Sequence, residues 1–412
     1  MNIKRRSFIK AISVAPIANS LIGYKKAIAD ISNYSPEEAF GFADNKVPMN
    51  AANLCPMPKA ISQSIATYND DLDFDMSGAN RTRIMAIKEK ARKGIAKQLN
   101  ISSTEVAITR NTSEANNIVA QGIELEAGDE ILLWNQNHPS NNVSWSVRAK
   151  RSNCVVKHFN IPIKTNDIEN VVNIILKNIT NKTKVISFTH ISNITGFKLP
   201  AKEICAAIKT KYNHIHIHID GAQTWGIINA DLHAMGCDSF SGSAHKWYMG
   251  PREIGLLVVR KPSVNRIWPG IVSIGWGNKE DTSAEGAKKF EAFGQRDDAA
   301  LAALSETVQF HASLTPQKIE DHATDIANHI RSALIEIDVK FVSSHHPSFT
   351  SNVIILEAPQ KNRKELLSNI LQEAGIILAG TGGLRLTPHI YNTIDHAKRV
   401  VKAINNSRNL LG

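Results

Sequence analysis

The sequence contains few cysteines and no long apolar run. Its four cysteines, Cys55, Cys154, Cys205 and Cys237, include no CxxC pair, so zinc-ribbon and thioredoxin-like motifs are absent. No stretch reaches the roughly 18 uninterrupted apolar residues of a transmembrane helix, so we expect no stable membrane insertion. Hydrophobic residues make up 42% and charged residues 21% of the 412 residues. These values are typical of a globular protein with one large or two medium domains.

Acidic residues are missing from the first 29 positions. Arg5 and Arg6 precede a mildly apolar stretch at 11–23, and Ala27-Ile28-Ala29 fits a small-x-small cleavage site. Because the apolar stretch is short and interrupted by a proline, the pattern resembles a twin-arginine export signal. We therefore expect residues 1–29 to be recognised by the twin-arginine export machinery and the mature protein to be periplasmic. The alternative is a basic N-terminus with an incidental amphipathic helix.

Residues 1–29 account for most of the positive net charge of the chain. The chain has 48 Lys and Arg against 38 Asp and Glu, a formal net charge of +10. Six of the basic residues lie within residues 1–29, which leaves 42 basic against 38 acidic residues in the remainder. Nucleic-acid binding requires a domain with clustered basic residues, so we expect no nucleic-acid partner.

From about residue 105 to 260, short β-branched runs alternate with helical patterns. Strands are expected at 106–109, 130–133, 154–159, 184–189, 215–219 and 254–259. Helices are expected from Ser113, after Pro139 and from Ala201. The alternation predicts an α/β fold with a mostly parallel sheet covered on both faces and ligands at the carboxyl ends of the strands. After about residue 305, strand candidates at 341–342 and 353–356 between helical patterns predict a smaller α/β domain.

An acidic residue that closes one strand and a lysine in a later Ser-x-His-Lys loop carry the strongest chemical signal. Asp220 begins Asp-Gly-Ala-Gln, and Lys246 ends Ser-Ala-His-Lys. An enzyme that holds pyridoxal 5'-phosphate (PLP) needs a lysine for the Schiff base and a carboxylate that keeps the pyridine nitrogen protonated. We therefore predict PLP as the cofactor, with Lys246 and Asp220 as catalytic residues. Taken alone, Asp220 would be interpreted as a helix cap.

Three histidines precede Asp220. His214, His216 and His218 alternate along the expected strand, so their side chains share a face and suggest a metal site. In a sheet covered on both faces, histidines that form hydrogen bonds within the core are the preferred interpretation. We therefore predict no metal.

Polar residues at other strand ends could complete the site. Thr112 or Ser113 at a helix N-cap would direct free N–H groups at a phosphate, although such caps are also common without a ligand. His138 could stack on the pyridine ring and help to move protons, and the Asn193 amide could bond the phenolic oxygen of the cofactor. Both residues also occur widely as structural hydrogen-bonding groups.

A glycine-rich turn, Gly380-Thr381-Gly382-Gly383, precedes Arg385. The guanidinium is a planar fork that matches a carboxylate, which an enzyme for amino acids must bind. The alternative for Arg385 is a surface ion pair. The glycines do not form G-x-G-x-x-G before a helix, which excludes a dinucleotide fingerprint.

Six motifs in matching order resemble the class V aminotransferases, a group of fold-type I PLP-dependent enzymes related to cysteine desulfurases and isopenicillin N epimerase-like proteins. The motifs are Asn-Thr-Ser-Glu, His-Pro-Ser-Asn, His-Ile-Ser-Asn-Ile-Thr-Gly, Asp-Gly-Ala-Gln, Ser-Ala-His-Lys-Trp and Leu-Arg-Leu-Thr-Pro-His. The resemblance spans about 45–405 and implies a large domain with a mostly parallel sheet, a smaller α/β C-terminal domain and a homodimer. The chain also resembles the exported members that tailor pyoverdine-type siderophores, which carry a twin-arginine signal.

The resemblance implies a role for each candidate residue. Lys246 forms the Schiff base, Asp220 contacts the pyridine nitrogen, and His138 stacks on the ring. Asn193 and Gln223 lie near the phenolic oxygen. The residues around the phosphate are Thr112, Ser113, Ser243 and His245. Arg385 binds the substrate carboxylate, and Gln295 could contact the phosphate in the partner subunit.

The domain boundaries follow from these positions. Residues 30–64 are expected to join the small domain, 65–305 to form the large PLP-binding domain, and 306–412 to form the small domain.

The expected function is aminotransferase-type chemistry on an amino acid or a similar compound. Because no cysteine follows Cys237, a desulfurase with a persulfide cysteine is disfavoured. A carbon–sulfur lyase or an epimerase without such a cysteine is the alternative. The alternative outside enzymes is an exported binding protein that keeps the fold.

Overall fold

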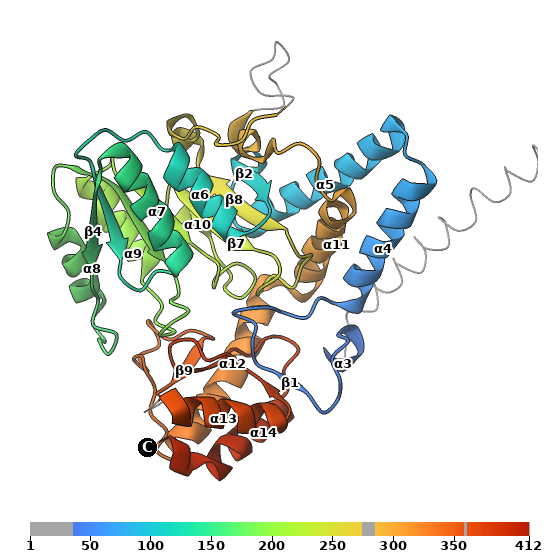
Figure 1. Cartoon of the computed structure of the whole chain (residues 1–412), viewed down its shortest axis with the longest axis vertical. Helices are drawn as coiled ribbons and strands as arrows, with labels where there is room; N and C mark the ends of the chain where they lie inside the picture. Colours follow the sequence, from blue (N-terminus) through green and yellow to red (C-terminus); the bar gives the residue numbers. More distant parts are fainter. Residues whose placement is uncertain (1–35, 274–284, 358–360, 412) are drawn as a thin grey trace, which may run out of the picture.

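The computed structural model describes residues 36–273, 285–357 and 361–411. The expected signal peptide, residues 1–29, lies outside these ranges. Within them the chain forms a large α/β domain and a smaller one that contains the C-terminal helices (Figure 1).

A seven-stranded sheet forms the centre of the large domain. Its order is β2 (Val106–Thr109), β8 (Gly255–Val259), β7 (Ser239–Ser243), β6 (His216–Asp220), β5 (Thr183–Thr189), β3 (Glu130–Trp134) and β4 (Val155–Phe159). Only β8 runs antiparallel to its neighbours, and the other adjacent strands are parallel. The predicted α/β fold with a mostly parallel sheet is confirmed.

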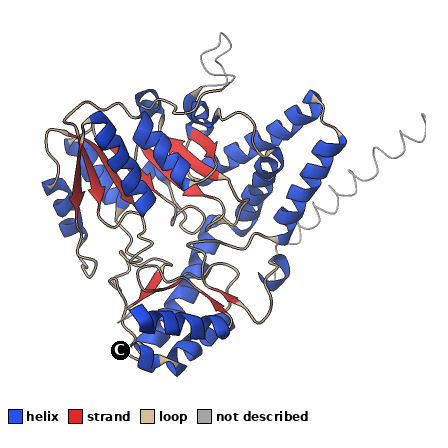
Figure 2. Cartoon of the chain, viewed as in Figure 1, coloured by secondary structure: helices blue, strands red, loops and turns tan. Residues whose placement is uncertain are grey.

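Helices cover both faces of this sheet (Figure 2). One face packs against α6 (Thr112–Gly122) and α7 (Pro139–Ser152). The other packs against α5 (Gly78–Gln98), α8 (Ile168–Lys177), α9 (Ala201–Lys211), α10 (Leu232–Met235) and α11 (Asp298–Leu314).

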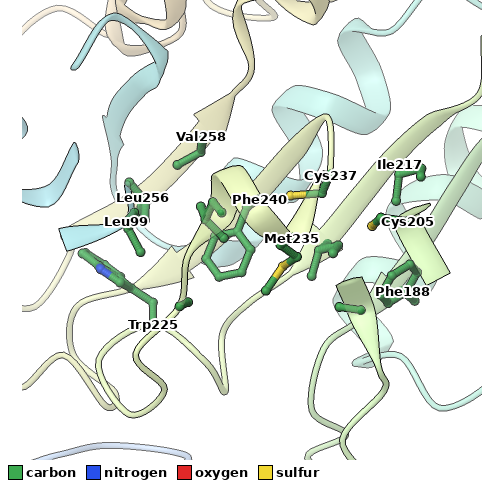
Figure 3. Packing of buried hydrophobic residues seen from close by; sticks show 14 of the residues in the cluster. Leu99, Phe188, Cys205, Ile217, Trp225, Met235, Cys237, Phe240, Leu256 and Val258 are labelled. Carbon is green, nitrogen blue, oxygen red and sulfur yellow. The ribbon is translucent and has the colours of Figure 1, made fainter. Parts of the chain in front are cut away.

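Side chains of successive strand residues alternate between these two layers. Ile131 and Leu133 of β3 belong to the α6–α7 side, whereas Leu132 and Trp134 belong to the other side. Figure 3 shows part of the second core, where Phe240 packs among residues of neighbouring strands and helices. Burial on both faces explains the near-continuous apolar runs in these strands.

Strand β7 is the one strand of the large sheet that the sequence pattern did not predict. Its sequence, Ser-Phe-Ser-Gly-Ser, contains no β-branched residue, so it lacks the usual strand signal. Small residues are needed there: a Cβ on Gly242 would lie 2.8 Å from Cε3 of Trp225. Close packing therefore determines the sequence of this strand more than propensity does.

The small domain contains two pairs of short strands. β9 (Ile354–Leu356) and β11 (Leu384–Leu386) are antiparallel, whereas β1 (Val47–Pro48) and β10 (Ile376–Ile377) are parallel. Its helices are α12 (Pro316–Ile335), α13 (Lys361–Glu373) and α14 (Ile394–Asn406). The expected strand at 353–356 corresponds to β9, while 341–342 contributes a single bridge, Phe341 to Leu356.

Two further helices lie near the N-terminus, α3 (Pro36–Ala39) and α4 (Lys59–Phe74), and α4 packs against α11. The longest helices, α5 and α12, have 21 and 20 residues and carry many charged side chains. No helix in the described ranges is both long and apolar enough to cross a membrane.

Candidate cofactor site

Five strands of the large sheet direct candidate residues to one edge. β2, β3, β5, β6 and β7 run in the same direction, so the segments that follow them lie together. These segments carry Thr112, His138, Asn193, Gln223 and Lys246. The carboxyl edge of a mostly parallel sheet is where ligands of such folds bind.

Asp220 ends β6 and is 1% exposed. Asn116 Nδ2 donates to its Oδ2 over 2.9 Å, and the Ala222 N–H donates to its Oδ1 over 3.0 Å. Within the described residues Asp220 forms no ion pair. A buried carboxylate without a cation is costly, and a protonated pyridine nitrogen would supply the missing partner.

Asn116 was not predicted from the sequence, and it connects several buried groups. Its Oδ1 accepts from His218 Nε2 over 2.9 Å and from Ser241 Oγ over 2.6 Å. It therefore orients Asp220 from helix α6. The available signal was a polar residue one turn after Thr112 on a face that is otherwise buried.

The histidines of β6 form hydrogen bonds inside the core. His216 Nε2 and His218 Nδ1 both contact Ser239 Oγ, at 2.9 and 2.8 Å. Burial lowers the pKa of His216 to about 4 and that of His218 to about 3, so both rings are neutral at pH 7. His214 is exposed. The described ranges contain no group of three or more His, Cys, Asp or Glu that could hold a metal ion.

Lys246 follows β7 and is half-buried, as is His245, whereas Trp247 on its other side is buried. Burial lowers the pKa of its ammonium; Asp220 opposes this shift and Arg385 adds to it. A lowered pKa increases the fraction of neutral amine, the form that attacks an aldehyde. The loop that carries Lys246 is fixed by a hydrogen bond from His389 Nε2 to the Trp247 carbonyl over 2.7 Å. The lysine is therefore presented from a rigid turn.

The expected phosphate end lies where α6 begins. The Thr112 N–H donates to Ser243 Oγ over 2.8 Å, and the two hydroxyl oxygens are 2.6 Å apart. The prediction of Thr112 or Ser113 as the N-cap is wrong: the cap is Asn111, which is extended and whose Oδ1 accepts from the Glu114 N–H over 2.9 Å. Ser113 is consequently in the first turn and exposed.

His245 is half-buried between Ser243 and Lys246. Burial, together with the charges of Lys246 and Arg252, lowers its pKa to about 4. The ring is therefore neutral at pH 7. The sequence prediction places it beside the phosphate, where a neutral imidazole can donate a hydrogen bond.

His138 is the N-cap of α7. The Ser140 N–H donates to its Nδ1 over 3.2 Å, so in the neutral ring the proton is on Nε2. Burial lowers the pKa of His138, and the charges of Lys246, Asp220 and Arg385 also act on it. His138 is therefore close enough to these three charged side chains to interact with them electrostatically.

Gln223 holds two segments together. Its Nε2 donates to the Ala52 carbonyl over 3.1 Å, and its Oε1 accepts from Trp247 Nε1 over 2.7 Å. One amide hydrogen is left for a ligand such as the phenolic oxygen. Trp247, which the sequence analysis did not assign to the site, therefore fixes the orientation of Gln223.

Gln295 lies apart from these residues and is exposed. Its Oε1 accepts from Arg81 Nη2 over 3.0 Å, and its Nε2 donates to the Arg296 carbonyl over 2.8 Å. Arg296 in turn donates to the Thr109 carbonyl over 3.0 Å, which places this loop near the end of β2. A contact with the partner's cofactor stays a prediction.

Arg385 lies on β11 of the small domain and is 4% exposed. Its Nη1 donates to the Asn193 carbonyl over 3.3 Å, whereas its Nε has no hydrogen-bond partner among the described residues. Burial lowers its pKa to about 10. Arg385 takes part in no described ion pair, so the surface ion pair considered for it is wrong. A buried guanidinium with a free donor fits a carboxylate.

The residues therefore fit PLP by their chemistry. An amine with a lowered pKa, a buried carboxylate without a cation and hydroxyl groups at a helix N-terminus are the three features that the aldehyde, the pyridine nitrogen and the phosphate require. The model for class V aminotransferases matches residues 56–403. The chain belongs to the class V aminotransferase family.

Curated and solved class V relatives agree with this assignment. An isopenicillin N epimerase from Streptomyces clavuligerus is 24% identical over 375 residues, 87% of this chain and 94% of that protein. A probable cysteine desulfurase from Halalkalibacterium halodurans is 31% identical over 264 residues, 61% of this chain and 62% of that protein. The family resemblance predicted from the motifs is confirmed.

Solved structures confirm the fold. A mutant of the cystine C–S lyase C-DES, with glycine covalently linked to its PLP cofactor, has a TM-score of 0.80 at 22% identity and covers 88% of this chain and 97% of its own. The Escherichia coli cysteine desulfurase CsdA has a TM-score of 0.77 at 21% identity and covers 92% of this chain and 100% of its own. Class V enzymes depend on PLP, so the predicted cofactor is confirmed at the level of the family.

Proposed function

We propose that this class V enzyme transfers the amino group of an α-amino acid. The observation that carries the proposal is Arg385: a buried guanidinium with an unpartnered Nε, close enough to Lys246 to lower the pKa of its amine. A carboxylate bound by Arg385 would place the α-carbon of the same molecule within reach of that amine. PLP, when bound, supplies the electron sink that stabilises negative charge at the α-carbon.

The proposal assigns a role to each of the main site residues. Lys246 would hold the cofactor through its aldehyde, and as a neutral amine it would move the α-proton of the substrate. Asp220 keeps a proton on the pyridine nitrogen, and Asn116 orients its carboxylate over 2.9 Å. His138, with its proton on Nε2, would lie against the cofactor ring. Thr112 and Ser243 bind the phosphate.

The cysteines support chemistry without a persulfide. Cys55, Cys205 and Cys237 are buried, and burial raises the pKa of Cys55 and Cys237 to about 12 and also raises that of Cys205. Cys154 is half-buried and its Sγ donates to the Glu126 carbonyl over 3.2 Å. Since the thiolate is the reactive form, none of the four suits the acceptance of sulfur from a substrate.

Product analysis tests the proposal. The holoenzyme is incubated with a panel of L-amino acids, and keto acid, free ammonia, sulfide and the D-enantiomer are measured. Transamination releases one keto acid for each amino group that stays on the cofactor. Further keto acid forms only after an acceptor keto acid is added. A D-enantiomer without keto acid would instead establish epimerisation, and sulfide or ammonia with pyruvate would establish a lyase.

The proposal extends to location and assembly. The paired Arg5 and Arg6 support export by the twin-arginine machinery into the periplasm, a route that carries folded, cofactor-loaded proteins. A homodimer is proposed as well, and the exposed Gln295 supports it because it lies near the end of β2 on a surface loop. Signal-peptide cleavage and sedimentation velocity of the mature protein test these two points.

A further inference from the structure

The N-terminal segment lies alongside the chain that leaves β11. The Thr387 N–H donates to the Met49 carbonyl over 2.8 Å, and the Ala51 N–H donates to the Thr387 carbonyl over 3.3 Å. This pattern is a parallel bridge between Asn50 and Thr387. Residues paired in this way direct their side chains to the same face.

That face is directed toward the large domain. Met49 and Leu386 both belong to the core of the small domain. Because successive side chains in extended chain alternate, Asn50 and Arg385 lie on the opposite face. Arg385 confirms the direction, since its Nη1 contacts the carbonyl of Asn193 in the large domain. Asn50 is therefore a neighbour of the carboxylate-binding arginine.

The side chain of Asn50 has an unused acceptor. Its Oδ1 is buried and has no hydrogen-bond partner among the described residues. The segment that carries it is fixed, because Gln223 binds the Ala52 carbonyl over 3.1 Å and the Cys55 N–H donates to the His245 carbonyl over 2.9 Å. A buried acceptor in a rigid setting is unfavourable unless a bound molecule supplies a donor.

We infer that Asn50 Oδ1 accepts a hydrogen bond from the side chain of the substrate. The substrate is thus an amino acid that carries a donor: a hydroxyl, an amide or an ammonium group. This inference rests on the proposed function, in which Arg385 binds the α-carboxylate. Amino acids with aliphatic or acidic side chains leave Asn50 Oδ1 unpaired, and a site built to bind a donor rejects analogues that lack it.

Substrate profiles of paired variants test the inference. We expect wild type to prefer serine, homoserine, glutamine or ornithine over 2-aminobutyrate and glutamate. Asn50→Ala should lower kcat/KM for the preferred substrate about tenfold, mainly through KM, because one hydrogen bond is lost. It should leave 2-aminobutyrate unchanged. Asn50→Ser keeps a neutral acceptor and should keep part of the preference, and Asn53→Ala, an exposed site in the same turn, should change nothing.

Three outcomes overturn the inference: no wild-type preference for donors, a preference for acidic side chains, or an unchanged preference in folded Asn50→Ala. Circular dichroism and cofactor absorbance establish folding, and Asn50→Val, which also lacks an acceptor, serves as the second variant if the alanine protein does not fold. If no amino acid is turned over, the proposed function fails instead. Isothermal titration of the same amino acids then tests Asn50 on its own, with a tenfold loss of affinity expected for donor-bearing ligands in the variant.

Discussion

Lys246 combines a reactive amine with a rigid support. Its pKa is lowered by burial, and the loop that carries it is tied down through the Trp247 carbonyl, which accepts from His389. The sequence pattern predicted Asp220 because it closes a strand that is easy to recognise, and Lys246 because it ends the Ser-Ala-His-Lys motif, although the strand before that motif was missed. It did not predict Asn116 or Trp247, since their function is to bond other site residues rather than to contact the ligand. Such support depends on side-chain geometry, which no local pattern encodes.

At this residue we predict that Lys246→Ala yields a folded protein without covalent cofactor and with essentially no turnover. No other lysine lies in the Ser-Ala-His-Lys loop, so the aldehyde has no alternative amine. Borohydride reduction of wild type followed by peptide mapping should find the label on Lys246. Lys261, in the 3-10 helix after β8, serves as the matched control, and a label there would contradict the assignment.

Arg385→Lys should weaken substrate binding while cofactor content stays unchanged. Lysine keeps the positive charge but lacks the two parallel N–H groups that bind a carboxylate, so KM should rise by about tenfold or more. Steady-state kinetics and cofactor absorbance measure the two effects separately. Arg399→Lys is a suitable control because Arg399 is half-buried on α14, away from the site, and among the described residues it donates to main-chain carbonyls of the N-terminal segment. An unaltered KM for every substrate would exclude Arg385 as the carboxylate group.

At the level of elements, the carboxyl group of Glu306 is buried between helices α4 and α11, and only one of its two oxygens has a hydrogen-bond partner among the described residues. Tyr68 Oη on α4 donates to Glu306 Oε1 on α11 over 2.7 Å, while Glu306 Oε2 is buried without a partner among the described residues. Burial raises the pKa of Glu306 from 4.5 to about 7. The folded protein therefore keeps this group protonated in a pH range where the unfolded chain has released the proton.

This raised pKa predicts a loss of stability as pH rises from about 4.5 to about 7, because the folded state binds the proton more tightly than the unfolded state. Glu306→Gln removes the titration. The variant should match wild type below pH 4.5 and exceed it above pH 7 by about 3 kcal/mol. Urea unfolding at pH 4.5 and pH 8 measures the difference, with Asp325→Asn on the exposed side of α12 as control. Equal effects at both pH values would contradict the prediction.

The elements that the sequence predicted best are those with strong periodicity. β2 and the other apolar strands were found at or within one residue of their bounds. β7 was missed because Gly242 must be small against Trp225, and the Asn111 cap was misassigned because Asn, Thr and Ser occur in succession there. All three residue types are good caps, and only backbone geometry selects among them.

For the whole molecule, we predict that replacement of both Arg5 and Arg6 by lysine leaves active, cofactor-loaded precursor in the cytoplasm. The reason is that the paired arginines are what the twin-arginine machinery recognises, while folding does not require transport. Cell fractionation with activity assays measures how the enzyme is distributed between periplasm and cytoplasm. The unaltered protein serves as the control. Wild-type protein that is uncleaved and wholly cytoplasmic would contradict the export prediction and leave the site unaffected.

The pairing of the N-terminal segment with the chain after β11 also constrains biosynthesis. The hydrogen bond from the Ala52 N–H to Thr387 Oγ1 joins residues 335 positions apart. During translation the first of these partners leaves the ribosome long before the second, so the large sheet can form while the small domain still lacks three of its four strands. A nascent chain that stops before Thr387 would contain Lys246 and Asp220, but Asn50 would lack its bridge partner Thr387. If Asn50 contacts the substrate as proposed, substrate selection becomes possible only in the last stage of synthesis.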